Sequence, residues 1–552
     1  MDSNNEARID PAVLNYNESK NESRTLENQL IVLYAEKGDV GKMQDLLSRN
    51  LVIDKYVIQK AFLIACEKGN PAIVALLLPE RINTADATKP RDLGSVNPTY
   101  NNDIALRISE KNGHVAVSLL LIKDGRVNPG SDDSFAIRMA SASGHTEVVR
   151  LLLQDARVDP AADDNYAIRW ASHYGHLDVI KLLLLDARVS PIANNNAALR
   201  MASENGHLES VRILLSDTRV DPSAEDNYAI RKASENGHTE VVRLLISDNR
   251  VDPSAASNYA VRLASSKGHL EVVRVLLSDA RTDPSSDNNY AFRSACEKGY
   301  LELVRLLMSD LRVDPTALSD KALRVACENG RTDILLQLLT DKRVNPSSKE
   351  NEAIQLASKN GHLEIIKILL GDKRVNPDAN KNIAIRWASE KGHLEVVRTL
   401  LADVDVDPSD YENEAIIGAS ANGHIAIVQL LLSDARVDPS SQHNFALLSA
   451  SANGYIDVVR ILLADNRVEP TENAVRWASA KGHYKIVAVL LADARVDPAL
   501  RDNSTLKKAI PMDETELNTL YKQTMIRNQM VGGRRKTISK RKKQQRNTRV
   551  KR

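Results

Sequence analysis

The side chains best suited to acid–base or metal chemistry are the twelve histidines, ten of which directly follow a glycine. A catalytic or metal site is a single place, whereas these ten recur at regular intervals along the chain. The motifs H-E-x-x-H, C-x-x-C and G-x-x-x-x-G-K are absent from the sequence. We therefore predict a protein that is not an enzyme, with no catalytic residue, no metal site and no cofactor. The ten are His114, His145, His176, His207, His238, His269, His362, His393, His424 and His483.

The three cysteines, Cys66, Cys296 and Cys327, each lie three residues before one of the recurring glycines, where Ser or Ala is usual. This pattern predicts a small buried residue. Cys296 and Cys327 hold equivalent positions 31 residues apart, too far for a disulfide without distortion. Free thiols are typical of a reducing compartment, so we predict an intracellular protein of the cytoplasm, the nucleus or both.

The elements that position these residues repeat with a fixed period. Thirteen glycines are spaced 31 residues apart, except for a last interval of 28, and two weaker copies precede them at Gly38 and Gly69. A fixed period of this size is typical of a solenoid. The thirteen are Gly113, Gly144, Gly175, Gly206, Gly237, Gly268, Gly299, Gly330, Gly361, Gly392, Gly423, Gly454 and Gly482.

One repeat predicts two short helices. Apolar residues recur at helical spacing on both sides of Gly175, and the glycine suits a left-handed residue that ends the first helix. Pro191 then forces an extended loop. Ten residues before the glycine stands Asn, Asp or Ser in twelve of the thirteen repeats. These residue types cap helices, so we predict that Asn165, Asn196, Asn227, Asn258 and Asn289 cap their first helices.

Tyr166 to Leu184, Y-A-I-R-W-A-S-H-Y-G-H-L-D-V-I-K-L-L-L, resembles the ankyrin repeat T-P-L-H-x-A-A-x-x-G-H-x-x-V-V-x-x-L-L. The sequence patterns N-Y-A-I-R and R-V-D-P are similar to those of the large ankyrin arrays of giant DNA viruses of amoebae and of protists. For a viral chain, this resemblance implies that the intracellular location is the host cell. The resemblance implies an all-α solenoid of about 15 helix-turn-helix repeats. It also implies that the histidines are structural hydrogen-bonders and that the chain is a monomeric, non-catalytic scaffold binding another protein on its concave face.

Two charged positions recur with the repeat. Arg stands six residues before the glycine in ten of thirteen repeats, and Asp stands eleven after it in all thirteen. We interpret these as a ladder in which Asp186 contacts Arg169, Arg188 or Arg200, with Asp155, Asp217 and Asp248 doing the same. A row of arginines would also suit a nucleic-acid groove. The three tryptophans, Trp170, Trp387 and Trp477, lie five residues before their glycines, where they either pack between repeats or form exposed hot spots.

The chain divides into four predicted parts. Residues 1–25 form a disordered lead, and 26–505 form the array, with a looped insertion within 79–95. Residues 506–533 form a capping helix or linker, and 534–552 form a basic disordered tail. The lead has no apolar core typical of a signal peptide, and no apolar run approaches membrane-spanning length. We therefore expect neither secretion nor membrane insertion.

The tail carries eleven Lys or Arg and no acid, which leaves 63 bases against 73 acids in the rest of the chain. Such a run is typical of a nuclear-localisation or nucleic-acid patch. An import receptor, RNA or DNA, and plain solubility remain the three alternatives for it. The basic-tail residues are Arg534, Arg535, Lys536, Lys540, Arg541, Lys542 and Lys543.

The variable pair before each glycine is the candidate partner-binding set, because the resemblance implies that this end of the first helix lies on the concave face. A plain solvated surface is the alternative interpretation of these polar positions. The alternative functions are a substrate adaptor for a ubiquitin ligase and a nucleic-acid-associated protein acting through the tail. The partner-binding candidates are His173, Tyr174, Glu204, Asn205, Glu235, Asn236, Ser266, Lys267, Glu297 and Lys298.

Overall fold

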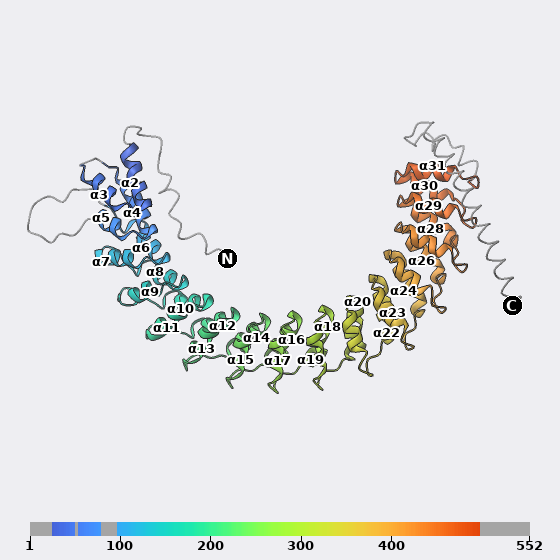
Figure 1. Cartoon of the computed structure of the whole chain (residues 1–552), viewed down its shortest axis with the longest axis horizontal. Helices are drawn as coiled ribbons and strands as arrows, with labels where there is room; N and C mark the ends of the chain where they lie inside the picture. Colours follow the sequence, from blue (N-terminus) through green and yellow to red (C-terminus); the bar gives the residue numbers. More distant parts are fainter. Residues whose placement is uncertain (1–24, 50–52, 79–95, 497–552) are drawn as a thin grey trace, which may run out of the picture. The chain divides into compact units, whose positions relative to one another are not determined.

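The computed structural model of the protein describes residues 25–49, 53–78 and 96–496, which hold thirty α-helices in fifteen successive pairs and no β-strand (Figure 1). The all-α repeat solenoid predicted from the sequence is thus confirmed. The helices fall into two compact units, Met1–Asp283 and Pro284–Arg552. None of the helices in the described ranges has the length and apolar character needed to span a bilayer. The predicted lead up to residue 24, the insertion within 79–95, the segment 506–533 and the tail 534–552 lie outside these ranges.

The first unit holds eight helix pairs, α2 to α17. In each pair the even-numbered element is the first helix and the odd-numbered element is the second. Their bounds are α2 Thr25–Lys37, α3 Val40–Ser48, α4 Lys55–Lys68, α5 Pro71–Leu77, α6 Tyr100–Lys111, α7 Val115–Asp124, α8 Ser131–Ala142, α9 Thr146–Leu153, α10 Ala162–Tyr174, α11 Leu177–Leu185, α12 Ala193–Glu204, α13 Leu208–Leu215, α14 Ala224–Glu235, α15 Thr239–Ile246, α16 Ala255–Lys267 and α17 Leu270–Leu277.

The second unit holds seven pairs, α18 to α31, arranged in the same way. Their bounds are α18 Ser286–Lys298, α19 Leu301–Met308, α20 Ala317–Glu328, α21 Thr332–Leu338, α22 Ser348–Asn360, α23 Leu363–Leu370, α24 Ala379–Lys391, α25 Leu394–Leu400, α26 Asp410–Ala421, α27 Ile425–Leu432, α28 Ser441–Ala452, α29 Ile456–Leu463, α30 Glu472–Ala480 and α31 Tyr484–Leu491.

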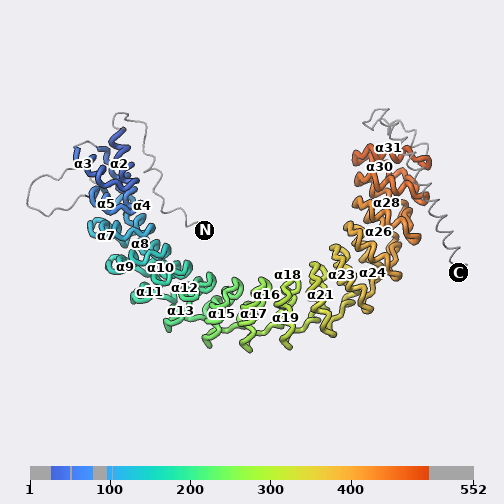
Figure 2. The backbone as a smooth tube through the Cα atoms, in the orientation of Figure 1, coloured from blue at the N-terminus to red at the C-terminus, as the bar shows by residue number. Residues whose placement is uncertain are grey.

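Within each unit, first helices pack on the first helices of the neighbouring pairs and second helices on second helices, as the tube view of Figure 2 shows. The apolar stripe predicted around Gly175 forms the core, because Ile168, Ala171, Val179 and Leu183 are fully buried. Each pair therefore buries its stripe only against its neighbours, which is how a solenoid extends without one large core.

Two constraints favour glycine at the end of each first helix: a left-handed backbone and the close approach of a side chain from the next repeat. Gly206 is left-handed, with φ +78°, and a Cβ built on it would lie 2.5 Å from Nδ1 of His238 in the next repeat. The imidazole of His238 packs there because its Nε2 donates a hydrogen bond to the carbonyl of Glu204, at 2.9 Å. All ten glycine-following histidines bond a backbone carbonyl of the preceding repeat in this way. These bonds confirm that the ten histidines are structural hydrogen-bonders between repeats.

A left-handed turn precedes most of the first helices. Asp163, Asp164 and Asn165 have φ of 53°, 52° and 59° before the right-handed part of α10 begins. Asn and Asp tolerate this region better than other residues with a Cβ. The repeat of α30 is three residues shorter, lacks the left-handed turn and starts from Thr471, whose side chain accepts from the N–H of Ala474. The 31-residue period is thus a 28-residue helix pair plus a three-residue turn.

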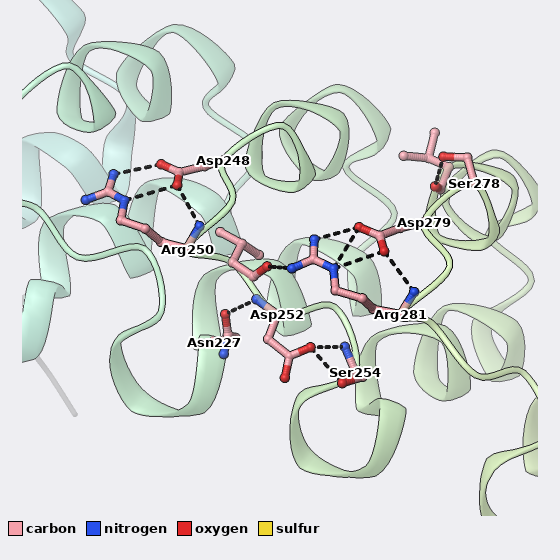
Figure 3. Close-up of polar contacts among 10 residues, drawn as sticks. Asn227, Asp248, Arg250, Asp252, Ser254, Ser278, Asp279 and Arg281 are labelled. Atoms are coloured by element: carbon pink, nitrogen blue, oxygen red, sulfur yellow. Dashed lines mark hydrogen bonds and ion pairs between the residues drawn. The ribbon is translucent and has the colours of Figure 1, made fainter.

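The predicted helix-capping role of Asn165, Asn196, Asn227, Asn258 and Asn289 is wrong. None of these side chains caps its helix. Each Oδ1 instead accepts the backbone N–H of the residue 25 positions later, in the loop that leads to the next repeat. Figure 3 shows this bond between Asn227 and the N–H of Asp252, at 2.7 Å. The five bonds are 2.6 to 2.9 Å long.

The predicted Asp–Arg pairing is confirmed for Asp155, Asp186, Asp217 and Asp248, each of which pairs with the arginine two residues later. Asp248 and Arg250 form a bidentate pair, with Nε–Oδ1 at 3.0 Å and Nη2–Oδ2 at 2.7 Å (Figure 3), and Asp186 pairs with Arg188 in the same way. The link along the stack is a different bond from the one predicted. In repeats such as that of Arg250, the remaining Nη1 donates to the carbonyl of the valine 30 residues earlier, here Val220 at 2.9 Å.

These pairs predict a loss of stability in acid. The hydrogen bond from the arginine lowers the pKa of the aspartate below its usual range, and the nearby guanidinium charge adds to this effect. In the window between the folded and the ordinary pKa, the unfolded chain binds more protons than the folded one. We expect the contribution of these pairs to the unfolding free energy to be level above about pH 5 and to fall as pH drops below about 4. Denaturant melts at several pH values measure this, and equal stability at pH 7 and pH 3 would contradict it. The nine aspartates are Asp155, Asp186, Asp217, Asp248, Asp279, Asp310, Asp341, Asp372 and Asp434.

Among the thirteen regular repeats, one lacks the Asp–Arg pair. Asp405 occupies the arginine position and places a second carboxylate beside Asp403, whose Oδ1 accepts the N–H of Asp405 at 3.0 Å. Replacing Asp405 with Arg should restore both the ion pair and the bond to the preceding repeat, raising the local opening free energy by about 1–2 kcal/mol. Hydrogen exchange across α22 to α25 measures the gain. Asp405→Ala is the control, because it removes the like charge without adding a donor. An equal gain from both variants would contradict a stabilising role of the Asp–Arg pair and of its bond to the preceding repeat.

Glu110 is a buried carboxyl in the column where nine other repeats carry a buried serine. It is fully buried, and within the described residues neither of its carboxylate oxygens has a hydrogen-bond partner. Burial raises the pKa of Glu110 well above its usual range, and the charge of Asp103 raises it further. The folded state therefore holds this proton more tightly than the unfolded state, so stability is lost as pH rises above about 4.3.

Replacing Glu110 with Ser should therefore stabilise the α6–α7 repeat at pH 7 by about 1–3 kcal/mol. The gain should shrink as pH approaches about 4, where the native carboxyl is protonated in both states. Amide exchange in α6, followed from pH 7 to pH 5 with its intrinsic rate corrected, measures both effects. A variant that exchanges as fast as the native chain at pH 7 would show that the carboxyl is tolerated without cost.

The three thiols are free and fully buried, as predicted for that column. Burial raises the pKa of each thiol far above its usual range. Cys66, Cys296 and Cys327 are therefore packing residues rather than nucleophiles, because the thiolate is the reactive form.

Candidate protein-binding surface

The predicted partner-binding residues lie at the carboxyl ends of first helices. His173 and Tyr174 end α10, and the equivalent pairs follow at the ends of α12, α14 and α16. These four helices pack consecutively, so the structure brings the first eight candidates into one row within the first unit. Glu297 and Lys298 end α18 and belong to the second unit. The row consists of His173, Tyr174, Glu204, Asn205, Glu235, Asn236, Ser266 and Lys267.

The two asparagines of the row already bond the preceding repeat. Asn236 donates from Nδ2 to the carbonyl of Glu204 in the preceding repeat, at 2.8 Å. Asn205 donates to Nδ1 of His173 at 3.0 Å and to the carbonyl of Met201 at 2.8 Å. Tyr174 and Lys267 are exposed, and no hydrogen bond or ion pair joins either side chain to another described residue. The freely presented part of the row is therefore smaller than the predicted set.

An aromatic cluster surrounds Tyr174. The Trp170 ring stacks on Tyr166, with centroids 5.4 Å apart, and meets His173 edge-on at 5.1 Å and Tyr174 at 5.8 Å. The Tyr174 ring also meets His173 edge-on at 4.7 Å, and 49% of Tyr174 remains exposed. No other first helix combines a tryptophan with an aromatic residue beside its glycine. Aromatic clusters of this kind are enriched at interface hot spots.

The charges beside this cluster come from the next two repeats. Burial lowers the pKa of His173 and the His207 ring lowers it further, whereas the Glu204 carboxylate opposes both. The Glu204 carboxylate accepts from the Tyr228 hydroxyl at 3.2 Å. Glu235 is more fully engaged, because it accepts from Lys232 at 2.8 Å and from the hydroxyl of Tyr259 at 3.1 Å.

The three tryptophans differ in whether they pack between repeats or are exposed, the two alternatives that the sequence left open. Trp170 and Trp387 are half-buried, and Trp477 is 51% exposed. The Lys359 ammonium lies 5.1 Å from the Trp387 ring centroid, so a cation of the chain itself already covers that ring. Trp170 is the tryptophan that lies in an aromatic cluster within the described ranges.

The row of arginines is occupied by structural contacts. Arg169 donates to the carbonyls of Asp163 and Asp164, both at 2.9 Å, and so holds the left-handed turn. Arg138 makes the equivalent bonds in its own repeat and lies 5.4 Å from the Tyr166 ring centroid in the next. These contacts favour a structural interpretation of the row over a nucleic-acid groove.

Sequence reasoning missed two parts of this surface. Met139 and Met201 occupy the position of Trp170 in the neighbouring first helices, and both are half-buried. Tyr166 is the first residue of the repeat motif, and its stacking on Trp170 is not evident from that motif. Aligning the repeats with one another would have shown the apolar column, but not its exposure. The basic-tail candidates Arg534 to Lys543 lie outside the described residues, as do all atoms beyond residue 496.

No group of His, Cys, Asp and Glu side chains suited to a metal ion occurs within residues 25–49, 53–78 and 96–496. No curated protein matches the sequence. The family profile described as ankyrin repeats, in three copies, matches residues 62–164, 137–226, 199–288, 230–319, 261–348, 323–411 and 416–502. These matches cover well over half of the chain, and the glycine turn, stacked pairs and inter-repeat histidine bonds agree with them. The chain therefore belongs to the ankyrin-repeat family.

Proposed function

We propose that the chain is a monomeric, non-catalytic scaffold that binds another protein on the concave face formed by its first helices. Ankyrin repeats generally mediate protein–protein interaction. The observation that carries the choice of face is the cluster around Tyr174, a large aromatic side chain left half exposed in a row of otherwise polar helix ends. Exposed aromatic anchors of this kind supply much of the binding energy at protein interfaces.

Site-specific photo-crosslinking tests this proposal. A photoreactive amino acid placed at Tyr174 of the full chain should capture a protein partner. The same group at Lys181, which is exposed on the second helix α11, should not. Crosslinks from Lys181 alone would move the binding face to the second helices and overturn the proposal. Capture of ubiquitin-ligase subunits would identify the scaffold as a substrate adaptor for a ligase. The resemblance to viral arrays is the reason to test for this.

The composition of residues 534–552 supports a second, independent activity. Eleven positive charges without an acid suit the acidic groove of an import receptor or a nucleic-acid backbone. We propose nuclear import, with the protein divided between cytoplasm and nucleus. Replacing Lys540, Arg541, Lys542 and Lys543 with Gln in the full chain should then leave it in the cytoplasm. RNA binding with steep salt dependence and unchanged localisation would instead assign the tail to nucleic acid.

A further inference from the structure

We infer that the first unit binds an extended, proline-rich segment of its partner, with a lysine or arginine at one end. This inference rests on the proposed function and names the partner class for the same face. Two observations and one general dimension lead to it: an apolar row across three consecutively packed helices, a carboxylate without a cation at the end of that row, and the usual spacing of packed helices.

The apolar row consists of Met139, Trp170 and Met201. They occupy the same position in α8, α10 and α12, which pack consecutively, and all three are half-buried. The next first helix has Lys232 at this position, held by Glu235 at 2.8 Å. On the other side, the same position in α6 holds Ile108, which is buried. The partly exposed row therefore extends over three repeats and ends at a charged pair.

The spacing of the row selects the conformation of the ligand. Packed helices lie about 8–10 Å apart. A polyproline II segment has three residues per turn and a rise of about 3.1 Å, so every third side chain returns to the same side after about 9 Å. An α-helix repeats after about 5.4 Å, and a β-strand presents the same face after about 6.6 Å. Of these side-chain spacings, that of polyproline II falls within the spacing of packed helices, whereas the two-turn spacing of an α-helix, about 10.5 Å, exceeds it. Polyproline II also docks on aromatic surfaces elsewhere.

The charge requirement comes from Glu204. Its carboxylate accepts from the Tyr228 hydroxyl, and the described residues supply no ion pair to it. Glu204 ends α12, the last helix of the apolar row, whereas the following Glu235 is already paired with Lys232. A cationic side chain that follows the apolar residues of the ligand would reach an acid that the stack leaves unpaired.

Fluorescence anisotropy with synthetic peptides and the full chain tests this inference. The probe is a labelled peptide of about twelve residues, with leucine at every third position of a proline background and a lysine at one end. It should bind, and Trp170→Ala should weaken binding at least tenfold. Glu204→Gln should remove the preference for lysine over glutamate at the peptide end. Trp477→Ala, which changes an exposed tryptophan at the same repeat position, is the matched control and should leave the affinity unchanged.

Several results would overturn the inference. These are equal binding of a peptide with the same composition but shuffled spacing, tighter binding of a helical leucine–lysine peptide, or equal losses from Trp170→Ala and Trp477→Ala. Tyr174→Ser is a second, exposed variant in case Trp170→Ala disturbs folding, which circular dichroism checks. A chain without residues 534–552 should bind equally well, since a large gain would assign the face to the chain's own tail. If no peptide binds while Tyr174 still crosslinks a partner, the inference fails and the proposed function stands.

Discussion

Replacing Gly206 with alanine is expected to open the stack between α12 and α14, lowering the local opening free energy by about 2–3 kcal/mol. The left-handed backbone alone costs a residue with a Cβ about 1–2 kcal/mol. The new Cβ would also lie 2.5 Å from the His238 ring, which must move and lose its bond to Glu204 at a cost of about 1 kcal/mol. Hydrogen exchange of the amides in α12 and α14 in the full chain measures the loss.

Gly125 separates the two causes. It is also left-handed, with φ +76°, but a Cβ built on it meets no described atom within 4 Å. Gly125→Ala should therefore show only the backbone cost, about half of the effect at Gly206. Equal losses at the two positions would mean that the histidine ring adapts freely and that its packing on the glycine contributes nothing.

Replacing Asn227 with alanine is expected to cost about 2–4 kcal/mol, more than the loss of an ordinary helix cap. The variant leaves the N–H of Asp252 without its acceptor in a partly buried site, at about 1–3 kcal/mol. It also places alanine at φ +59°, where asparagine is better tolerated. Exchange of the Asp252 amide and the thermal midpoint of the full chain measure the loss.

Asn227→Asp is the matched control. Asp320 stands at the equivalent position of another repeat and accepts the N–H of Asn345 at 2.9 Å, so a carboxylate can make the same bond. We expect the aspartate variant to keep most of the stability. If alanine and aspartate cost the same, the side-chain oxygen is not what joins the two repeats.

The repeat architecture could be predicted because each repeat supplies the same signal again. Gly175 between two apolar stripes, followed by histidine, indicates a helix pair wherever it recurs. The role of Asn165 could not be predicted, since an asparagine before an apolar stripe has the pattern of a helix cap. Its true partner is Ser190, in the loop after the second helix, and this contact exists only once the turn is left-handed.

The candidate surface shows a similar division. Variability at the helix ends indicated His173 and Tyr174, and the structure places both in one aromatic cluster. The same argument also selected Asn205 and Asn236, whose side chains bond the preceding repeat. Sequence variation reports where packing constraints are weak, but hydrogen bonds between residues 32 positions apart depend on the register of stacking.

A hydrogen-exchange footprint of the captured partner on the full chain tests the central claim most directly. The account predicts that partner binding protects the carboxyl-terminal turns of α8, α10, α12 and α14, and that the second helices α9, α11, α13 and α15 exchange as in the free chain. It also predicts that Tyr174→Ser removes the protection without changing exchange in the unbound protein. Protection confined to the second helices, or an undiminished footprint in the variant, would contradict binding through the first-helix face.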